Sequence, residues 1–546
     1  TAEGDLNAYH TNYNTAPGVI PVPTDPNETD YSGGFLTCLI FTTCRTSLAT
    51  PATAENSTAN AYELDTDAVT LTAKLDLNEN LTLVSVTGYR DVYDTQIFDF
   101  DGSAAPYITI QKFNEYDQLS QELRIDGAWE DFRITAGLYY WNSEFDQDWI
   151  TGDMFWSTLF GASIDSNDPA GPFVWDLCQA GAIPGFIVFC DPGIEGGIPL
   201  GQVITQILYE TQETTSIAAF AQADWDLTDR LTLTAGLRWT REEKDFIAGQ
   251  AYLTTVARQR LRNFPEYANL SRTWTELSPK AGLTYRLNDK TIVYGSYSEG
   301  FHSGGFFGVN QNTADFVRDQ YDPEFAESWE FGYKSLLADD RLKFNVTVFR
   351  NDFSDKQEQS IQFDPGTKTV ATVFDNVASA VYQGLEVETE LLVNENLRLF
   401  FNYGYLDADY DQFETDINAS DGVELVEDAS FLKPRNAPES TIGLGGTLGF
   451  TVGSGDVELF MKYSIVDERE TTLLNTPLGK VDEIKTLSAS VGYYAENYSV
   501  VLYGKNLTDE RYETFFGLPA GGNLGLFALG TVNNPRTYAI EFTYEM

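Results

Sequence analysis

Long apolar runs are absent from this sequence. No segment approaches the roughly 18 consecutive apolar residues that a membrane-spanning helix needs, although 42% of the 546 residues are hydrophobic. A transmembrane helix is therefore excluded. A transmembrane β-barrel stays possible, because a barrel strand presents only every second residue to the lipid.

Basic residues are scarce. The chain has 34 lysines and arginines against 82 aspartates and glutamates, which gives a formal net charge of −48. Such an excess repels phosphate groups, so the sequence predicts no nucleic-acid partner. A disordered acidic chain would contain few aromatic residues, whereas this chain is 14% aromatic. We therefore expect a folded protein whose loops carry much of the charge.

Histidine is rarer still. The two histidines, His10 and His302, lie in unrelated segments, and neither belongs to a nucleophile-elbow, metal-ligand or phosphate-loop motif. Carboxylate pairs carry no signal here, because aspartate and glutamate are so abundant that pairs arise by chance. The sequence predicts neither an enzyme nor a bound cofactor.

Cysteines are few and fall into two close pairs. Cys38 and Cys44 form one pair, and Cys178 and Cys190 form the other, both within loop-like sequence. Close pairing predicts two local disulfides and an oxidising compartment, with free thiols as the alternative. A zinc site is disfavoured because histidine partners are lacking.

Alternation with a period of two is the dominant pattern. Apolar residues occupy every second position from Leu231 to Trp239, from Leu342 to Val348 and from Leu397 to Tyr405, with mostly polar residues or glycine between them. In strands, one set faces lipid and the other a watery lumen. A soluble β-sandwich is the alternative. Segments well beyond ten residues, with aromatic residues near their ends, favour the barrel.

The breaks between these segments alternate between short and long. Short turns on the periplasmic side and long extracellular loops are typical of outer-membrane barrels. We count about 17 strands from residue 59 onward, and a weaker candidate from Leu6 to Tyr13. The short breaks lie at 78–80, 129–131, 228–230, 288–290, 338–340 and 394–396, and the long ones include 16–58, 149–203, 303–321 and 414–436.

Five segments resemble, in order, the barrel of TonB-dependent receptors, especially those of sphingomonads and their marine relatives. Any one of them is weak, but the ordered set covers most of the chain from about residue 60. We read the segment from Leu507 to Tyr512 as a strand that continues toward the outer rim. The segments are 278–286 with 294–306, 323–334, 376–386, 505–512 and 535–538.

The resemblance implies an antiparallel barrel of 22 strands with a plugged lumen. It also implies active import of a bulky, scarce nutrient (a siderophore, vitamin, metal complex or glycan) across the Gram-negative outer membrane, powered through TonB. The expected partners are outer-membrane lipid, the plug domain, the TonB complex and a small-molecule or glycan ligand. A passive porin and a surface adhesin or structural barrel remain the alternatives.

The same resemblance sets expectations for the domains. Residues 1–58 read as an N-terminal strand and a long extracellular loop, and residues 59–546 as the barrel. Turn residues such as Pro17, Pro21 and Gly33 mark the first segment, and nothing in it reads as a plug. We therefore expect this chain to lack the plug, the TonB-contact segment and roughly four early strands.

Two groups of residues are candidates for binding. Aromatic side chains crowd the break at 149–203 and could stack on a ring-containing ligand, or else simply fold that loop over the barrel mouth. Acidic residues near 407–414 could bind calcium weakly, or else form a solvated rim. The candidate ligand-facing residues are Trp149, Phe155, Trp156, Trp175 and His302, and the candidate calcium ligands are Asp407, Asp409, Asp411 and Glu414.

Overall fold

The structure, a computed structural model, describes most of the chain outside the long breaks. The described residues form no helix that is long and apolar enough to cross a bilayer. Their ranges are 8–11, 61–99, 108–153, 204–254, 260–263, 268–306, 320–364, 369–417, 426–475, 479–517 and 528–545.

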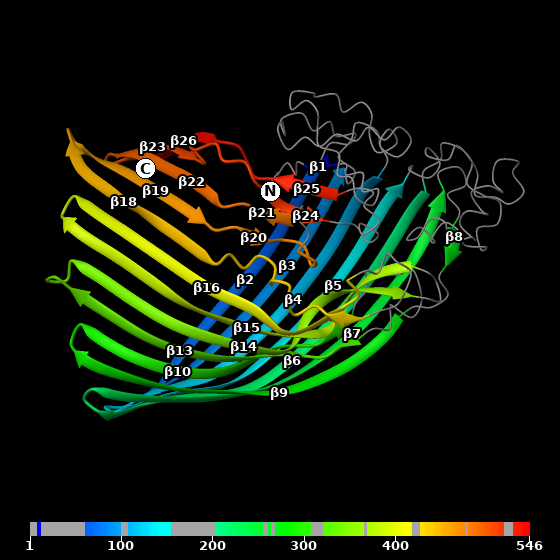
Figure 1. The fold of residues 1–546 in the computed structure, drawn as a ribbon. Helices are drawn as coiled ribbons and strands as arrows, with labels where there is room; N and C mark the ends of the chain where they lie inside the picture. The colour runs from blue at the N-terminus through cyan, green and yellow to red at the C-terminus, as the bar shows by residue number, and fades with distance from the viewer. Residues whose placement is uncertain are drawn as a thin grey trace, which may run out of the picture.

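Antiparallel strands make up the wall and curl into a barrel (Figure 1). Each strand pairs with the next one along the chain, apart from short strands in the long connections. The roughly 17 strands expected from the sequence are found. They are β2 (Ala61–Asn78), β3 (Leu81–Asp99), β4 (Ile108–Ala128), β5 (Phe132–Asp153), β6 (Ile204–Thr228), β7 (Leu231–Thr254), β9 (Ala268–Asn288), β10 (Thr291–His302), β13 (Glu324–Leu337), β14 (Leu342–Asp364), β15 (Thr369–Asn394), β16 (Leu397–Thr415), β18 (Ser440–Val452), β19 (Gly455–Val466), β22 (Ile484–Tyr494), β23 (Tyr498–Lys505) and β26 (Thr537–Tyr544).

Short strands lie in the connections at one end of the barrel. β8 (Arg260–Asn263) pairs with β7, and β17 (Glu427–Asp428) pairs with β16. β11 (Gly305–Phe306) pairs with β12 (Gln320–Tyr321), and β20 (Arg469–Glu470) pairs with β21 (Lys480–Val481). β1 (Ala8–Thr11), β25 (Ala528–Val532) and β24 (Glu513–Gly517) form a separate sheet.

Tight turns join the strands at the other end, as the short breaks predicted. Three of these turns begin with an asparagine whose side chain caps the turn. The Oδ1 atoms of Asn78, Asn288 and Asn394 each accept a 2.9 Å hydrogen bond from the backbone N–H two residues on. Asparagine favours this local bond, so the sequence itself fixes where these strands reverse.

The wall has an apolar outer face that ends at a charged edge. On β16, Leu399, Phe401 and Tyr405 are exposed on one face, and Asp407 follows them on that face. On β7, Leu237 and Trp239 are likewise exposed and are followed by the paired Arg241 and Glu243. The expected period of two is therefore present. The outward-facing apolar belt spans only the half of each strand nearest the short turns.

Two of the predicted boundaries were wrong. Trp149, assigned to a long loop, lies within β5, where it pairs with Lys112 and Leu208. The segment after Lys505 leaves the strand instead of continuing it. Asn506 and Asp509 adopt positive φ angles of 50° and 57°, and the Asn506 side chain bonds the backbone of Glu510. These local bonds replace the ladder of a strand.

The structure places the weak N-terminal strand outside the wall. β1 forms as expected, but it pairs with β25, which lies in the connection between β23 and β26 at the long-loop end. Most of the segment 1–58 lies outside the described residues.

Candidate ligand-binding site

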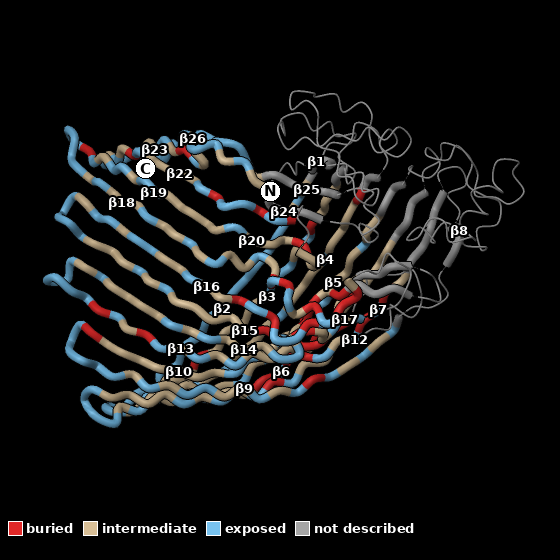
Figure 2. Tube along the Cα trace, viewed as in Figure 1, coloured by how far each residue is buried: buried red, intermediate tan, exposed pale blue. Residues whose placement is uncertain are grey.

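The lumen face of the long-loop half carries a group of buried residues, which Figure 2 shows around β12 and β17. Two connections fold inward there. One joins β10 to β13 and contains the Ser303–Gly304–Gly305–Phe306 segment of the sequence motif. The other joins β16 to β18 and includes residues 426–439. Together they line one side of the barrel mouth.

Lys244 of β7 holds the first inward segment. Its Nζ atom donates 2.8 Å hydrogen bonds to the Ser303 hydroxyl and to the Gly304 carbonyl. Glu242, on the same face of β7, accepts from the Ser303 hydroxyl and lies 3.3 Å from the Lys244 Nζ atom. Both charged side chains are mostly buried, at 14% and 17% exposed. Each charge therefore compensates the other, as burial requires.

Aromatic packing explains the glycines of this segment. A Cβ atom on Gly304 would lie 2.3 Å from the Tyr321 carbonyl and 2.6 Å from the Trp274 ring, so no larger residue fits. Phe306 stacks on Phe246, with ring centroids 5.4 Å apart. The segment can therefore lie flat on the lumen face of β7 and β9.

Gln357 of β14 ties down both ends of this inward connection. Its Nε2 atom donates 3.0 Å hydrogen bonds to the carbonyls of Ser303 and Asp322, and it lies 3.4 Å from that of His302. The Asn376 side chain of β15 donates a 2.9 Å hydrogen bond to the Asp322 carbonyl. It also accepts a 2.6 Å hydrogen bond from the backbone N–H of Asp322. Two amide side chains thus hold both ends of the connection to the wall.

Tyr321 also helps to hold this part of the connection in place. Its ring meets that of Phe374 edge to face, with centroids 5.0 Å apart. Burial raises the pKa of the Tyr321 phenol above its ordinary value, because the phenolate would lose hydration.

Glu358 anchors the second inward connection. It accepts a 3.0 Å hydrogen bond from the Tyr410 hydroxyl and another from Arg435, which lies between β17 and β18. Around this ion pair, Phe413, Ala429 and Leu432 pack into a buried apolar cluster. Lys433 bonds Asp409, and this hydrogen bond raises the pKa of the Lys433 ammonium. The connection is therefore held by charge and by apolar contact together.

A neighbouring part of the wall presents a cation against an aromatic ring. The Lys112 Nζ atom lies 3.8 Å from the centroid of the Trp149 ring, on the lumen face of β4 and β5. Beside this pair, Asn114 bonds Asp94 and accepts a 2.8 Å hydrogen bond from Gln147. Such side chains can hold a polar ligand that also carries rings or negative charge.

The structure separates the predicted ligand-facing residues. Trp149 lies on the lumen wall. His302 is exposed at the end of β10, opposite Glu324 in register and beside the Gln357 contact. Phe155, Trp156, Trp175, and the cysteines Cys38, Cys44, Cys178 and Cys190 all lie outside the described residues, so both disulfides stay predictions. The alternation could not reveal Lys244, Gln357 and Glu358, because it shows only which face they occupy.

The acidic candidates do not converge on one point. Asp407 accepts a 3.1 Å hydrogen bond from Gln383, and Asp409 pairs with Lys433. Glu414 pairs through its backbone with Asp428 of β17, and Asp411 is exposed next to a bulge. In the part of the chain that the structure describes, no group of three or more potential ligands is placed to hold a metal ion. Weak calcium binding stays a prediction.

Comparison with known proteins gives consistent matches. The model of the family described as "TonB dependent receptor-like, beta-barrel" matches residues 2–507. The rhizobactin receptor of Rhizobium meliloti is 22% identical over 466 residues, which cover 79% of this chain and 58% of that protein. The probable TonB-dependent siderophore receptor PiuA of Acinetobacter baumannii is 26% identical over 206 residues, or 36% of this chain and 24% of that protein.

The fold is also similar to that of solved structures. The ferric yersiniabactin uptake receptor FyuA of Yersinia pestis superposes with a TM-score of 0.64 at 16% identity. The alignment covers 89% of this chain and 62% of FyuA. The chain thus spans about a quarter to three fifths of the length of these relatives.

Proposed function

We propose that this chain, which belongs to the TonB-dependent receptor β-barrel family, forms the wall and capture surface of an active importer of a ferric siderophore. The protein resides in the outer membrane of a Gram-negative bacterium. Family members are transport receptors rather than enzymes, and the barrel would perform no bond chemistry. Energy would come from the TonB complex.

The anchored inward connection at the barrel mouth carries this proposal. Lys244 and Gln357 fix the Ser303–Phe306 segment against the lumen wall from two sides. This arrangement supports the proposal because a receptor needs fixed groups that present a binding surface. Pre-ordered groups also bind more tightly, because less freedom is lost when the ligand arrives.

The choice of a ferric siderophore rests on the relatives and on the lumen chemistry. PiuA is described as a siderophore receptor, and FyuA as an uptake receptor for ferric yersiniabactin. Lys112 over Trp149, with Arg272 beside Trp274 on the same side of the wall, combines cations with aromatic faces. Such a surface suits a complex with aromatic or acidic iron-chelating groups, despite the acidic net charge of the chain.

Binding to the purified protein, expressed from its own gene, tests this substrate class. Tryptophan fluorescence would be titrated with ferric catecholate, ferric hydroxamate, ferric carboxylate, cobalamin and oligosaccharide ligands. We expect saturable quenching by at least one ferric complex, and at least tenfold weaker binding of that ligand by Trp149→Ala than by Trp225→Ala. Trp225 lies on the outer face and serves as the matched control.

The alternatives predict different results. A passive porin would show steady conductance in a planar bilayer and no saturable binding. A glycan or vitamin importer would bind only the corresponding ligand of the panel. An adhesin would bind cells or matrix without solute uptake.

A further inference from the structure

A row of polar side chains crosses the lumen face next to Lys112 and Trp149. Its members lie directly opposite one another in register on four neighbouring strands, where side chains are close enough to bond. This polar row consists of Asp94 on β3, Asn114 on β4, Gln147 on β5 and Glu210 on β6.

Asp94 sets the direction of the hydrogen bonds along the polar row. It accepts hydrogen bonds from the Asn114 side-chain amide and, at 2.9 Å, from the Gln96 Nε2 atom. Because the Asn114 nitrogen is used on Asp94, its oxygen accepts from the next strand, where the Gln147 Nε2 atom donates a 2.8 Å hydrogen bond. The oxygen of the Gln147 amide is thereby left as an acceptor on the strand beside Glu210.

Glu210 is the last member of the polar row and interrupts its hydrogen bonding. An ionised carboxylate can only accept, so it cannot bond the oxygen of the Gln147 amide. Among the described residues, none donates a hydrogen bond to Glu210 either. A protonated Glu210 carboxyl can donate to Gln147 and so extend the row by one hydrogen bond.

The surroundings of Glu210 also favour the protonated form. Its opposed neighbours on β5 and β7, Gln147 and Ala248, carry no charge. Lys112 of β4 is the charged group of the described residues that acts on Glu210, and its ammonium also interacts with Asp94. Burial outweighs the attraction of this shared cation and raises the pKa of the Glu210 carboxyl.

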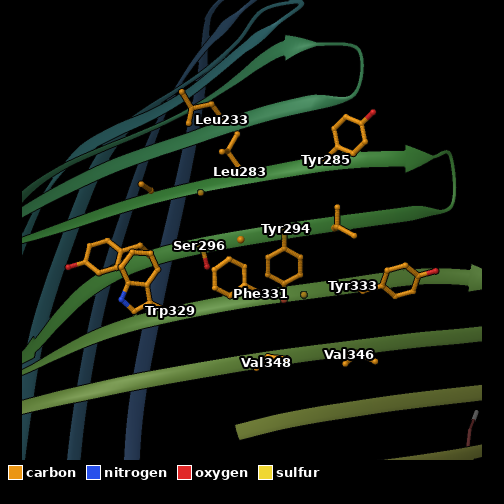
Figure 3. A pocket seen from close by; sticks show the side chains of 16 residues that line it. Leu233, Leu283, Tyr285, Tyr294, Ser296, Trp329, Phe331, Tyr333, Val346 and Val348 are labelled. Carbon is orange, nitrogen blue, oxygen red and sulfur yellow. The ribbon is translucent and has the colours of Figure 1, made fainter. Parts of the chain in front are cut away.

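Glu210 lies beyond the lipid-facing belt. Nearer the short turns, the outer face of the wall is apolar, for example at Leu283 and Val348 (Figure 3). At the level of Glu210, the outer face of β5 instead carries Asp146 and Asp148, on either side of Gln147. The polar row is therefore in the part of the lumen that the external medium reaches.

We propose that Glu210 is a proton-operated control of the ligand-binding face, a proposal that rests on the function proposed above. With Glu210 ionised, the group of Lys112, Asp94 and Glu210 carries one net negative charge, which repels an anionic ferric complex. With Glu210 protonated, the group is neutral and Glu210 bonds Gln147. The protein therefore binds an anionic ferric complex more tightly in mildly acidic medium.

The proton on Glu210 can be followed without any ligand. Trp149 lies in the adjacent row and holds the Lys112 ammonium 3.8 Å from its ring centroid, so its ¹⁹F resonance in protein labelled with 5-fluorotryptophan should report the change. We expect this resonance to shift with a midpoint above the ordinary glutamate value of about 4.3. Glu210→Gln should abolish the shift.

The matched control is Glu213→Gln, which removes a carboxylate from the outer face of the same strand and should leave the shift unchanged. The same midpoint in both variants would assign the titration to another group and overturn the proposal. So would a resonance of the intact protein that does not move between pH 4.3 and 7.

Ligand binding at pH 7 tests the consequence. Gln at position 210 imitates the protonated carboxyl, so Glu210→Gln should bind a trianionic ferric tricatecholate complex roughly threefold more tightly than the intact protein, the scale of a half-exposed charge interaction. Affinity for a neutral ferric trihydroxamate complex should stay the same, and Glu213→Gln should change neither affinity.

Equal gains for the neutral and the anionic complex, or no gain for either, would overturn the control by charge. If the intact protein bound no ferric complex of any class, the function proposed above would fail instead. The ligand-free ¹⁹F titration would then decide on its own whether Glu210 takes up the proton.

Discussion

Tyr294 lies directly opposite Gly332, and its ring occupies the space where a side chain on Gly332 would be. A Cβ atom built on Gly332 would come within 2.1 Å of that ring. On the other face of the same two strands, Phe331 lies opposite Gly295, and its ring is 3.1 Å from a Cβ built there. Two sequence motifs thus meet so that an aromatic ring from each covers a glycine of the other.

This relationship predicts a large difference between two glycine substitutions. Gly332→Ala should lower the free energy of unfolding by about 1–3 kcal/mol, because the methyl group overpacks against Tyr294. Gly300→Ala, on the paired strand β10, should change it by less than about 0.5 kcal/mol, because no neighbouring atom lies within 4 Å of a Cβ built there. Urea unfolding in liposomes, followed by tryptophan fluorescence, measures both. Equal unfolding midpoints for the two variants would refute this packing role.

Removal of the Lys244 ammonium should release the first inward connection. Lys244→Met leaves Glu242 mostly buried without its cation and breaks the bonds to Ser303 and Gly304. We expect the free energy of local opening at residues 303–306 to fall by roughly 2–3 kcal/mol, because an unpaired buried charge is costly. Hydrogen exchange of that peptide is the measurement.

A double variant is the control for this prediction. Adding Glu242→Gln to Lys244→Met removes the uncompensated charge and should restore part of the protection. Unchanged exchange in the single variant would mean that Lys244 does not hold the segment.

The segment around Tyr321, where the first inward connection is held to the wall, should loosen at alkaline pH. Because the pKa of Tyr321 is raised on folding, its contribution to stability is complete below the ordinary tyrosine value near 10 and is lost as the pH rises through the raised value. Hydrogen exchange at residues 320–322, corrected for intrinsic rates, should increase above about pH 10. Tyr321→Phe cannot ionise and should remove this dependence. If both proteins show the same pH profile, Tyr321 is not the responsible group.

The wall could be predicted from the sequence because its signals are local. Alternation from Leu397 to Tyr405 shows which residues face lipid, and an asparagine such as Asn394 caps its own turn. Both signals depend on residues at most a few positions apart. These patterns predicted the number of wall strands and the positions of the short turns that join them at one end.

The binding surface could not be predicted in this way. Gln357 reaches Ser303 across 54 positions, and Arg435 reaches Glu358 across 77. Such contacts depend on how the inward connections pack, which no periodicity encodes. The segment from Leu507 to Tyr512 was mistaken for a strand because the side-chain bonds of Asn506, which bend the backbone, do not disturb the alternation.

Uptake by whole cells tests the central claim most directly. A Gram-negative host without its own ferric siderophore receptors would express this protein from its own gene, with and without a functional TonB. Accumulation of radioactive iron from the ferric siderophore bound most tightly in the fluorescence panel would be measured at nanomolar concentration. We predict saturable uptake that disappears when TonB is removed, while binding at the cell surface remains. Equal uptake in both hosts, rising linearly with concentration, would contradict active import and favour a passive channel.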